Sequence, residues 1–333
     1  MTFPVESVLG DVRAALCENR SVVLVAPPGS GKTTCVPPAM MDLPFLASRK
    51  TVMLEPRRLA ARNAARWIAA QRGEQVGESV GYQVRLEKKV SAATRLEIVT
   101  EGLLARRFAH DAELSDTGLL FFDEFHERSL HCDFAFALAV DVRRALRNDL
   151  RIAVMSATLD PGRVAEFLGD AVTIRAEGRM FPVTTHWMRE ESQAPSWALA
   201  ARGVRKALET ASGDILAFLP GEGEIRRAAE ELAGTPGADV MPLYGALPRE
   251  EQDRAFAPAH PGRRKVVLST SIAETSLTID GIRAVVDTGY MRLGRFSPAS
   301  GMNRLETLRI TRDRADQRRG RAGRTAPGDC FRM

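Results

Sequence analysis

The sequence is poor in the features that mark extracellular and metal-binding proteins. Its 333 residues contain four cysteines, at positions 17, 35, 132 and 330, and no two of them form a C-x-x-C pair. The five histidines include no His-Glu-x-x-His spacing. These absences argue against a disulfide scaffold and a zinc ribbon, and they predict free thiols in a reducing cytoplasm.

Long apolar runs and aromatic residues are also scarce. No run approaches the roughly 18 apolar residues of a membrane-spanning helix, and residues 1–11 lack the basic-then-apolar pattern of a secretory signal. We therefore expect a protein that binds no membrane. Aromatic residues make up 6% of the chain and form no RNA-recognition-motif pattern. Any nucleic acid should therefore be held through its sugar-phosphate backbone, with little sequence preference.

The composition is otherwise that of a globular protein, with 44% hydrophobic and 27% charged residues. Such values exclude disorder as the main state. The net charge of +5 is unevenly distributed, because residues 1–177 are neutral and residues 178–333 carry the whole excess. A basic balance of this size permits binding to a polyanion without demonstrating it.

Short apolar runs alternate with helical patterns along the chain, which is long enough for two domains. In the first half, strands are predicted at residues 21–26, 51–54, 95–100, 119–122 and 151–155, and helices at 32–41, 57–71, 102–108 and 132–147. The pattern restarts after a seam near residues 177–182, with strands at 214–219, 240–243, 265–270 and 284–287 and helices at 197–210, 222–233 and 249–257.

This alternation predicts an α/β fold with two domains, residues 1–177 and 178–333, each a mostly parallel sheet flanked by helices. Residues 330–333 resemble the start of another strand, which predicts that the native polypeptide continues. In the helix at 132–147, the apolar side chains expected in the core are those of Phe134, Phe136, Leu138 and Val142.

A phosphate-binding loop follows the first predicted strand. Residues 26–34 match the pattern G-x-x-x-x-G-K-[ST], except that Ala26 replaces the first glycine. Glycines let successive backbone N–H groups face a phosphate at a helix N-terminus. Lys32 is expected to reach the β- and γ-phosphates, and Thr33 to hold Mg²⁺. The expected nucleotide ligands in this loop are Gly29, Ser30, Gly31, Lys32, Thr33 and Thr34.

Two adjacent carboxylates, Asp123 and Glu124, follow the apolar run at residues 118–122. The carboxyl end of a buried strand is where a phosphate-loop enzyme needs such groups. Asp123 is expected to bind Mg²⁺ and Glu124 to polarise the attacking water, so that Thr33, Asp123 and Glu124 form the predicted metal site. His126 is expected to couple this site to the second domain.

These segments resemble the motifs of superfamily 2 helicases, in the same order. They are Gly-Ser-Gly-Lys-Thr at 29–33, Asp-Glu-Phe-His at 123–126, Ser-Ala-Thr at 156–158 and Gln-Arg-Arg-Gly-Arg-Ala-Gly-Arg at 317–324. The set resembles the DEAH-box group, and residues 54–63 and 123–130 are most similar to its bacterial HrpB type. The resemblance covers nearly the whole chain. It implies two tandem RecA-like domains with the nucleotide in the cleft between them.

The resemblance also implies roles for individual residues. Backbone contacts to nucleic acid are implied for Pro56, Arg57, Arg58, Thr100, Glu101, Gly102, Thr270 and Ser271. Contacts to the nucleotide are implied for Phe256 at the base and for Thr278 and Asp280 at the ribose. Catalytic roles at the γ-phosphate are implied for Lys32, Glu124, Gln317, Arg321 and Arg324, the last two as arginine fingers. Coupling of hydrolysis to strand movement is implied for His126, Ser156 and Thr158.

The Arg-rich segment at 316–324 could, by its charge alone, be a solvated face. A second sheet domain that packs against the phosphate loop would instead bring it to the γ-phosphate, where such arginines are worth about 10³–10⁵ in rate.

Some positions depart from the family pattern. Ser271 replaces the usual Asn, and Arg319 replaces the usual Ala. Trp67 replaces an Arg that covers one face of the base, so Trp67 or Arg66 is the expected stacking residue. Residues 289–301, where the family has a strand-separating hairpin, contain no two-residue turn signal.

The function implied is Mg²⁺-dependent hydrolysis of ATP, with tolerance of other nucleotides, coupled to 3′→5′ movement along RNA or single-stranded DNA. We expect a cytoplasmic monomer that lacks the family's C-terminal accessory domains. An activator protein is a further expected partner. One alternative is a nucleic-acid-stimulated ATPase that remodels protein–RNA complexes without processive unwinding. Another is a non-catalytic, nucleotide-gated binding module, against which the intact Lys32, Glu124, Gln317 and Arg321 argue.

Overall fold

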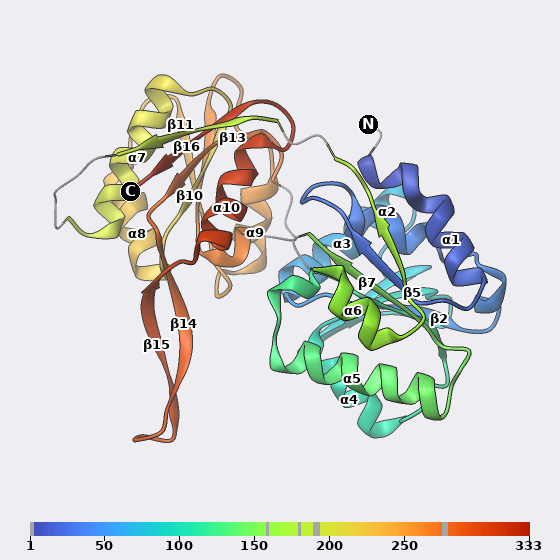
Figure 1. The fold of residues 1–333 in the computed structure, drawn as a ribbon. Coiled ribbons are helices and arrows are strands. Elements are labelled where there is room, and N and C mark those ends of the chain that lie inside the picture. The colour runs from blue at the N-terminus through green and yellow to red at the C-terminus, as the bar shows by residue number, and fades with distance from the viewer. Residues whose placement is uncertain (1–2, 158–159, 179–180, 189–193, 275–278) are drawn as a thin grey trace. The chain divides into compact units, whose positions relative to one another are not determined.

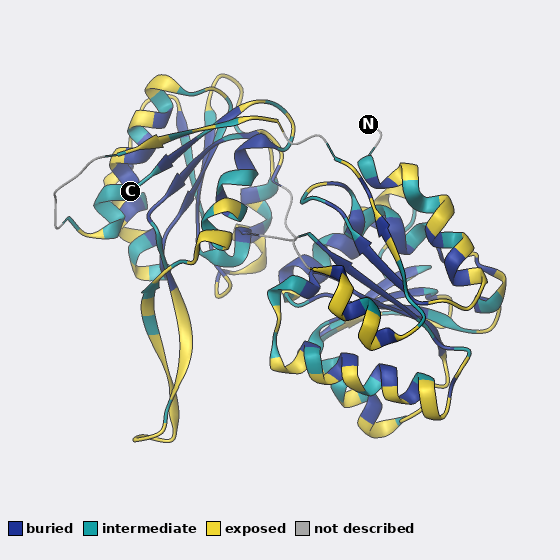
Figure 2. Cartoon of the chain, in the orientation of Figure 1, coloured by how far each residue is buried: buried dark blue, intermediate teal, exposed yellow. Residues whose placement is uncertain are grey.

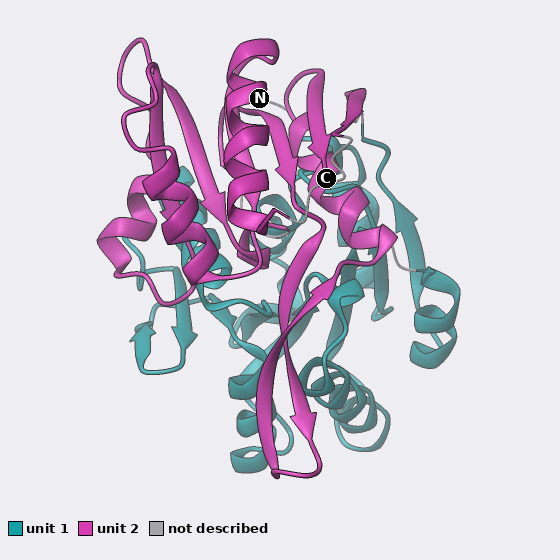
Figure 3. Ribbon diagram, turned by 90° about the vertical axis from the view of Figure 1, so that its left-hand side faces the viewer, with its two compact units in different colours: residues 1–179 teal, residues 180–333 magenta. Residues whose placement is uncertain are grey.

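The chain folds into two compact units, residues 1–179 and 180–333, drawn in different colours in Figure 3. The computed structural model describes residues 3–157, 160–178, 181–188, 194–274 and 279–333. The division lies two residues beyond the expected boundary at Glu177. Within the described residues, no helix has both the length and the apolar character needed to cross a bilayer.

Unit 1 is an eight-stranded sheet in the order β4-β3-β5-β2-β6-β7-β1-β8 (Figure 1). All neighbours are parallel except β3 and β4, which form an antiparallel pair. The strands are β1 (Val22–Val25), β2 (Lys50–Leu54), β3 (Val80–Val84), β4 (Glu87–Lys89), β5 (Leu96–Val99), β6 (Thr117–Phe122), β7 (Arg151–Ser156) and β8 (Val172–Arg175).

Helices cover both faces of this sheet because its central strands are apolar on both sides. In β6, Leu119 and Phe121 face one core, and Leu120 and Phe122 face the other. Such a continuous apolar run is typical of a parallel strand buried on both faces. One core is completed by α1 (Leu9–Cys17), α2 (Lys32–Ala39) and α3 (Arg58–Gln71), and the other by α4 (Glu101–His110), α5 (Leu130–Ala145) and α6 (Pro161–Leu168).

Unit 2 is a six-stranded, wholly parallel sheet in the order β11-β12-β10-β13-β16-β9. Its strands are β9 (Val183–Trp187), β10 (Asp214–Phe218), β11 (Ala238–Leu243), β12 (Arg264–Ser269), β13 (Ile282–Asp287) and β16 (Gly328–Arg332), and its helices are α7 (Ser196–Thr210), α8 (Glu222–Glu231), α9 (Arg249–Phe256) and α10 (Arg312–Gly320). One face packs against α7 and α8. The central strands are buried in both units, as the dark ribbons of Figure 2 show.

These observations confirm two α/β units with mostly parallel sheets, and the last predicted strand is present as β16. One core prediction was wrong, because Phe136 and Val142 are buried whereas Phe134 is 53% exposed. Phe134 lies near the start of α5, on the exposed side of the helix.

An antiparallel hairpin, β14 (Tyr290–Ser297) and β15 (Met302–Arg309), projects from unit 2 (Figure 1). It lies where the resemblance implies a hairpin, although the sequence lacks a two-residue turn signal. The turn is longer and spans residues 298–301, closed by a hydrogen bond from the Gly301 N–H to the Ser297 carbonyl, with Gly301 at φ +65°. A glycine tolerates this left-handed backbone conformation without strain.

Candidate active site and nucleic-acid interface

The phosphate loop joins β1 to α2 and is shaped by two left-handed glycines, Gly29 at φ +78° and Gly31 at φ +90°. A Cβ on Gly31 would lie 2.9 Å from both Cys35 Sγ and the Phe3 side chain, so only glycine fits there. The Val5 N–H donates to the Ser30 carbonyl at 3.1 Å. The N-terminal segment therefore packs directly against the loop and fixes its curvature.

Lys32, the first residue of α2, is buried and folds back over the loop. Its Nζ donates to the carbonyls of Ala26, at 2.9 Å, and Pro27, at 3.3 Å. Ser30 is also buried, and its Oγ has no hydrogen-bond partner among the described residues. An ammonium held at the mouth of the loop and an unsatisfied hydroxyl are groups that an incoming phosphate could satisfy. Thr34 follows, half-buried, on the first turn of α2.

The carboxylate pair lies beside this loop. Asp123 follows β6, and Thr33 Oγ1 donates to Asp123 Oδ2 at 2.5 Å. Burial and the neighbouring Glu124 carboxylate raise the pKa of Asp123 to about 7, while Lys32 and the Thr33 hydroxyl act in the opposite direction. A hydroxyl and a carboxylate so close together are hard oxygen ligands that suit Mg²⁺. A divalent cation there would favour the ionised carboxylate.

Glu124 begins a sharp turn with its backbone at φ +47°. It is buried, and its Oε2 lies 3.5 Å from His126 Nδ1. The same ring nitrogen lies 3.4 Å from Ser156 Oγ and accepts the Ala157 N–H at 3.4 Å. His126 therefore stands between Glu124 and the Ser-Ala-Thr segment after β7, whose Thr158 lies outside the described residues.

The residues of unit 1 that are predicted to contact nucleic acid follow β2 and β5. They lie at the edge that also carries the phosphate loop, because the carboxyl ends of parallel strands share one edge. Pro56, Arg57 and Arg58 follow β2, and Thr100, Glu101 and Gly102 follow β5. Side chains at this edge also contact one another. Arg57 Nη2 lies 3.1 Å from Glu127 Oε2, and Ser129 Oγ donates to Glu101 Oε2 at 2.6 Å. Burial raises the pKa of Glu101, which the Ser129 hydroxyl partly offsets.

The two candidates for base stacking lie side by side on α3. Trp67 is 38% exposed and meets Phe3 edge-on, with ring centroids 6.1 Å apart. Arg66 is half-buried. Through Phe3, Trp67 is connected to the phosphate loop, whereas Phe256, the other predicted stacking residue, is the last residue of α9 in unit 2.

In unit 2 the predicted site residues lie in two places, in the segment between β12 and β13 and on α10 with the turn that follows it. Thr270 and Ser271 follow β12 and lie at the start of the 3-10 turn η4 (Ser271–Ala273). Asp280 is exposed and lies two residues before β13, and Thr278 lies outside the described residues. Gln317 is half-buried on α10.

The two predicted arginine fingers differ in burial. Arg321 is buried in the 3-10 turn η5 (Arg321–Gly323), and its Nε donates to the Glu274 carbonyl at 2.9 Å. Arg324 is half-buried. Sequence reasoning did not single out Arg318, which is fully buried. Its Nε donates to Glu274 Oε1 at 2.8 Å, and its Nη1 donates to Asp287 Oδ1 at 2.7 Å.

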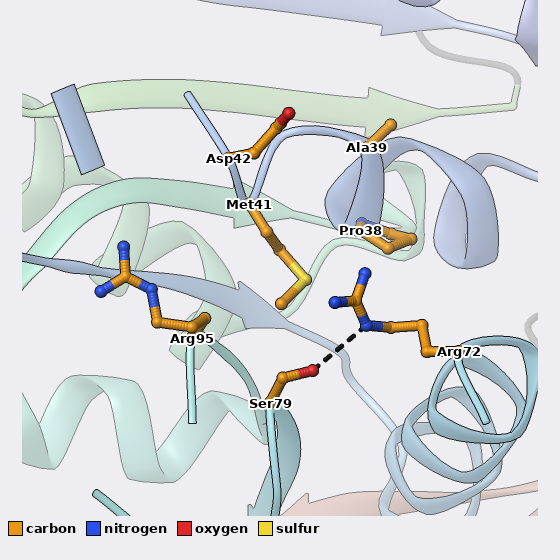
Figure 4. Close-up of a pocket in the computed structure, with 7 residues that line it drawn as sticks. All are labelled: Pro38, Ala39, Met41, Asp42, Arg72, Ser79 and Arg95. Carbon is orange, nitrogen blue, oxygen red and sulfur yellow. Dashed lines mark hydrogen bonds between the residues drawn. The ribbon is translucent and has the colours of Figure 1, made fainter. Parts of the chain in front are cut away.

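A recess of about 340 Å³ on unit 1 lies apart from these groups (Figure 4). It is lined by Pro38, Ala39, Met41, Asp42, Arg72, Ser79 and Arg95. No residue predicted for the nucleotide, metal or nucleic-acid site lines it. Its arginine Arg72 already donates through Nε to Ser79 Oγ and Glu74 Oε1, at 3.1 Å each.

Comparison with known proteins agrees with these features. A family model described as DEAD/DEAH box helicase matches residues 11–167, and one described as helicase conserved C-terminal domain matches residues 201–326. The Escherichia coli ATP-dependent RNA helicase HrpB is 46% identical over 329 residues, which is 98% of this chain and 40% of that protein. The chain thus spans about two fifths of that relative.

Solved structures of similar proteins agree as well. A crystal structure of the Escherichia coli DEAH/RHA helicase HrpB matches with a TM-score of 0.93 and 45% identity, over 99% of this chain and 42% of that one. A crystal structure of the E. coli DExH-box NTPase HrpB matches with a TM-score of 0.85 and 45% identity, over 100% of this chain and 41% of that one. With the phosphate loop, the carboxylate pair and both helicase models in one chain, this protein belongs to the DEAD/DEAH-box helicases.

Proposed function

We propose that this chain is the nucleotide-hydrolysing core of a helicase that moves 3′→5′ along a single strand, with RNA the favoured substrate and ATP the favoured nucleotide. The observation that carries this is the 2.5 Å contact between Thr33 and Asp123. It joins the phosphate loop to the carboxylate pair within one unit, and Glu124 lies in the adjacent turn. The proposed location is the cytoplasm, which suits the free thiols of the four cysteines.

In this proposal Lys32 and the loop N–H groups bind the phosphates, and Thr33 and Asp123 hold Mg²⁺. The bound Mg²⁺ would neutralise charge on the phosphate oxygens. Glu124 accepts a proton from the attacking water, which Gln317 helps to orient. Arg321 and Arg324 would stabilise charge on the transferred phosphoryl group once the two units close around the nucleotide. Closure is thus the step that couples hydrolysis to movement.

Nucleic acid would lie along the strand ends of both units. The contacts proposed in unit 1 are Pro56, Arg57, Arg58, Thr100, Glu101 and Gly102, and those in unit 2 are Thr270 and Ser271. His126 and Ser156, with Thr158, would relay the hydrolysis state to this surface. Because such contacts address the backbone, binding should depend on salt more than on sequence.

The base and ribose would be held with little selectivity. Phe256 is proposed to stack on one face of the base and Trp67 or Arg66 on the other, with Thr278 and Asp280 at the ribose. Stacking tolerates every base, which fits the use of other nucleoside triphosphates.

The remaining three fifths of the relative's length would supply accessory domains and, with them, binding sites for an activator protein. Without such domains this core is proposed to hydrolyse ATP well and to unwind poorly. We also propose that it is a monomer.

The test is steady-state ATP hydrolysis by this chain, with and without poly-U RNA or single-stranded DNA, at low and high salt. Glu124→Gln serves as the blank, because loss of a general base lowers the rate by about 10²–10⁴. Stimulation that fades with salt and vanishes in Glu124→Gln supports the proposal. Tight ATP binding without turnover would instead favour a nucleotide-gated binding module.

A directional unwinding assay on the full-length protein separates the two enzymatic alternatives. A duplex with a 3′ single-stranded tail should be unwound, whereas one with a 5′ tail should not. Stimulated hydrolysis without unwinding of either duplex would indicate an ATPase that remodels protein–RNA complexes.

A further inference from the structure

The segment that follows the Asp-Glu-Phe-His motif contacts both nucleic-acid motifs of unit 1. Glu127 Oε2 lies 3.1 Å from Arg57 Nη2, and Ser129 Oγ donates to Glu101 Oε2 at 2.6 Å. Arg57 follows β2, and Glu101 opens α4 after β5. Two residues separated by a single position therefore connect two motifs that come from different strands.

The same segment is tied to Glu124 by short, well-defined structure. Residues Phe125–Glu127 form the 3-10 turn η3, and the Glu127 N–H donates to the Glu124 carbonyl at 2.8 Å. Ser129 then caps α5 by accepting the Cys132 N–H at 3.0 Å. Glu127 is thus separated from Glu124 by a single hydrogen-bonded turn, so a movement of Glu127 can be passed to Glu124 through the backbone.

The turn is also anchored in the core, which limits how it can move. The Phe125 ring packs edge-on against Phe136, with centroids 4.8 Å apart, and against Phe122, with centroids 6.3 Å apart. Packed cores respond to a local displacement by discrete shifts more than by gradual deformation. The part of the segment that lies outside this core is its polar side, which contacts Arg57 and Glu101.

We propose that Glu127 and Ser129 are positioning residues that transmit nucleic-acid binding at Arg57 and Glu101 to Glu124. The inference rests on the proposed function, because it needs a phosphate of the bound strand to lie at Arg57. Such a phosphate competes with the Glu127 carboxylate for the same guanidinium. The Arg57 and Glu127 side chains are 19% and 20% exposed, so solvent screens this competition only in part.

Glu127→Gln tests the link, since it keeps the shape of the side chain and removes the charge. We expect nucleic-acid stimulation of ATP hydrolysis, measured at saturating poly-U, to fall by about fivefold or more, in the range typical of coupling between sites. The affinity for a labelled oligo-U, measured by fluorescence anisotropy, should not weaken, because a negative charge near the phosphate is removed. A purely structural role would lower affinity and stimulation together.

Glu74→Gln is the matched control. The Glu74 side chain is 22% exposed and pairs with an arginine, Arg72, at 3.1 Å, just beyond the C-terminal end of α3, whereas Arg57 is the N-cap of that helix. Nucleic acid should stimulate ATP hydrolysis by Glu74→Gln as strongly as it stimulates hydrolysis by the unchanged chain. Glu127→Asp keeps the charge on a shorter side chain and should show intermediate stimulation. Thermal unfolding shows whether Glu127→Gln folds. If it does not, the comparison is made with Glu127→Asp.

The outcomes separate the two proposals. Stimulated hydrolysis by the unchanged chain, with Glu127→Gln stimulated as strongly as Glu74→Gln, would overturn the role of Glu127 and leave the proposed function standing. A parallel loss of affinity and stimulation would also overturn it. An unchanged chain that hydrolyses ATP without any response to nucleic acid would overturn both.

Discussion

Arg318 and Glu274 form a fully buried ion pair in unit 2, with Arg318 Nη2 2.6 Å from Glu274 Oε1. The guanidinium also contacts Asp287 Oδ1 at 2.7 Å and donates to the Tyr290 carbonyl at 3.2 Å. It lies over the Phe218 ring, 4.8 Å from its centroid. One side chain thus connects α10, the turn after β12, the end of β13 and the base of the hairpin. Glu274 in turn holds the predicted finger Arg321 through its carbonyl.

Arg318→Met should destabilise unit 2 strongly. The substitution leaves buried carboxylates without their central partner, and breaking a buried ion pair in this way costs about 3–5 kcal/mol. The measurement is urea unfolding followed by tryptophan fluorescence in a Trp67→Phe background, so that the signal comes from Trp187 and Trp197, both in unit 2. Arg319→Ala is the control, because the Arg319 side chain is 41% exposed and its pair with Asp316 spans 3.6 Å. Equal midpoints for the two variants would contradict the prediction.

Gly31→Ala should disrupt the phosphate loop. Its Cβ would lie 2.9 Å from Cys35 Sγ and from Phe3, at a backbone φ of +90° that other residues avoid. The strain is worth roughly 1–3 kcal/mol, so affinity for a fluorescent ATP analogue should fall by about tenfold. In Gly10→Ala the new Cβ meets nothing within 4 Å, at a helical position of α1, so nucleotide affinity should be retained. A Gly31→Ala chain that binds the analogue as tightly as Gly10→Ala would refute this account of the loop.

Thr33→Val should raise the Mg²⁺ concentration needed for half-maximal ATP hydrolysis. Valine keeps the shape of threonine but lacks the hydroxyl that contacts Asp123. Changes beside metal ligands cost 10–100-fold in metal affinity, so we expect a shift of about tenfold or more. Thr33→Ser, which keeps the hydroxyl, should stay close to the unchanged chain. An unshifted Mg²⁺ titration for Thr33→Val would remove Thr33 from the metal site.

The cysteines should differ widely in reactivity at pH 8. Burial raises the pKa of Cys132 and of Cys330 to about 12, and it also raises the pKa of the half-buried Cys35. Cys17 is exposed. Because the thiolate is the reactive form, both buried thiols should stay protonated and unreactive until the pH approaches 12. Labelling of the native chain with iodoacetamide should modify Cys17 first, as read by mass spectrometry, and all four only after denaturation. Rapid labelling of Cys132 or Cys330 in the native state would contradict their burial.

The sequence predicted the central strands and the motifs at their ends. In β6 and β7 every residue after the first is apolar or small, and such runs are legible without a structure because both faces are buried. The order of the phosphate loop, Asp123, Glu124 and the Arg-rich segment could likewise be read from the residues. The phosphate loop follows β1 and the carboxylate pair follows β6, at strand ends that share one edge of the parallel sheet of unit 1, whereas the Arg-rich segment belongs to unit 2.

Of the edge strands, β11 was predicted at residues 240–243, whereas β4, β8 and β9 were not, and the hairpin was implied only by the resemblance and by no signal in its own residues. In β9 and β15 the burial pattern is mostly exposed or intermediate, so their residues carry no clear apolar periodicity. Met302 and Leu305 of the hairpin are exposed. The structure of such segments comes from pairing with a neighbouring strand, which is a non-local interaction that a local pattern does not record.

By itself, then, the sequence determined the α/β class, the two repeated units and the identity of the phosphate-loop and carboxylate motifs, because buried strands and glycine-dependent turns impose residue types locally. Only the tertiary structure decided which charges are partners. The four arginines of residues 316–324 look alike in the sequence, yet Arg318 is fully buried between Glu274 and Asp287, while the Arg319 side chain is 41% exposed. The contact of Glu127 with Arg57 was equally hidden. Each pair joins residues that are far apart in the chain, and its strength depends on burial, which arises only when the sheet and its helices have packed.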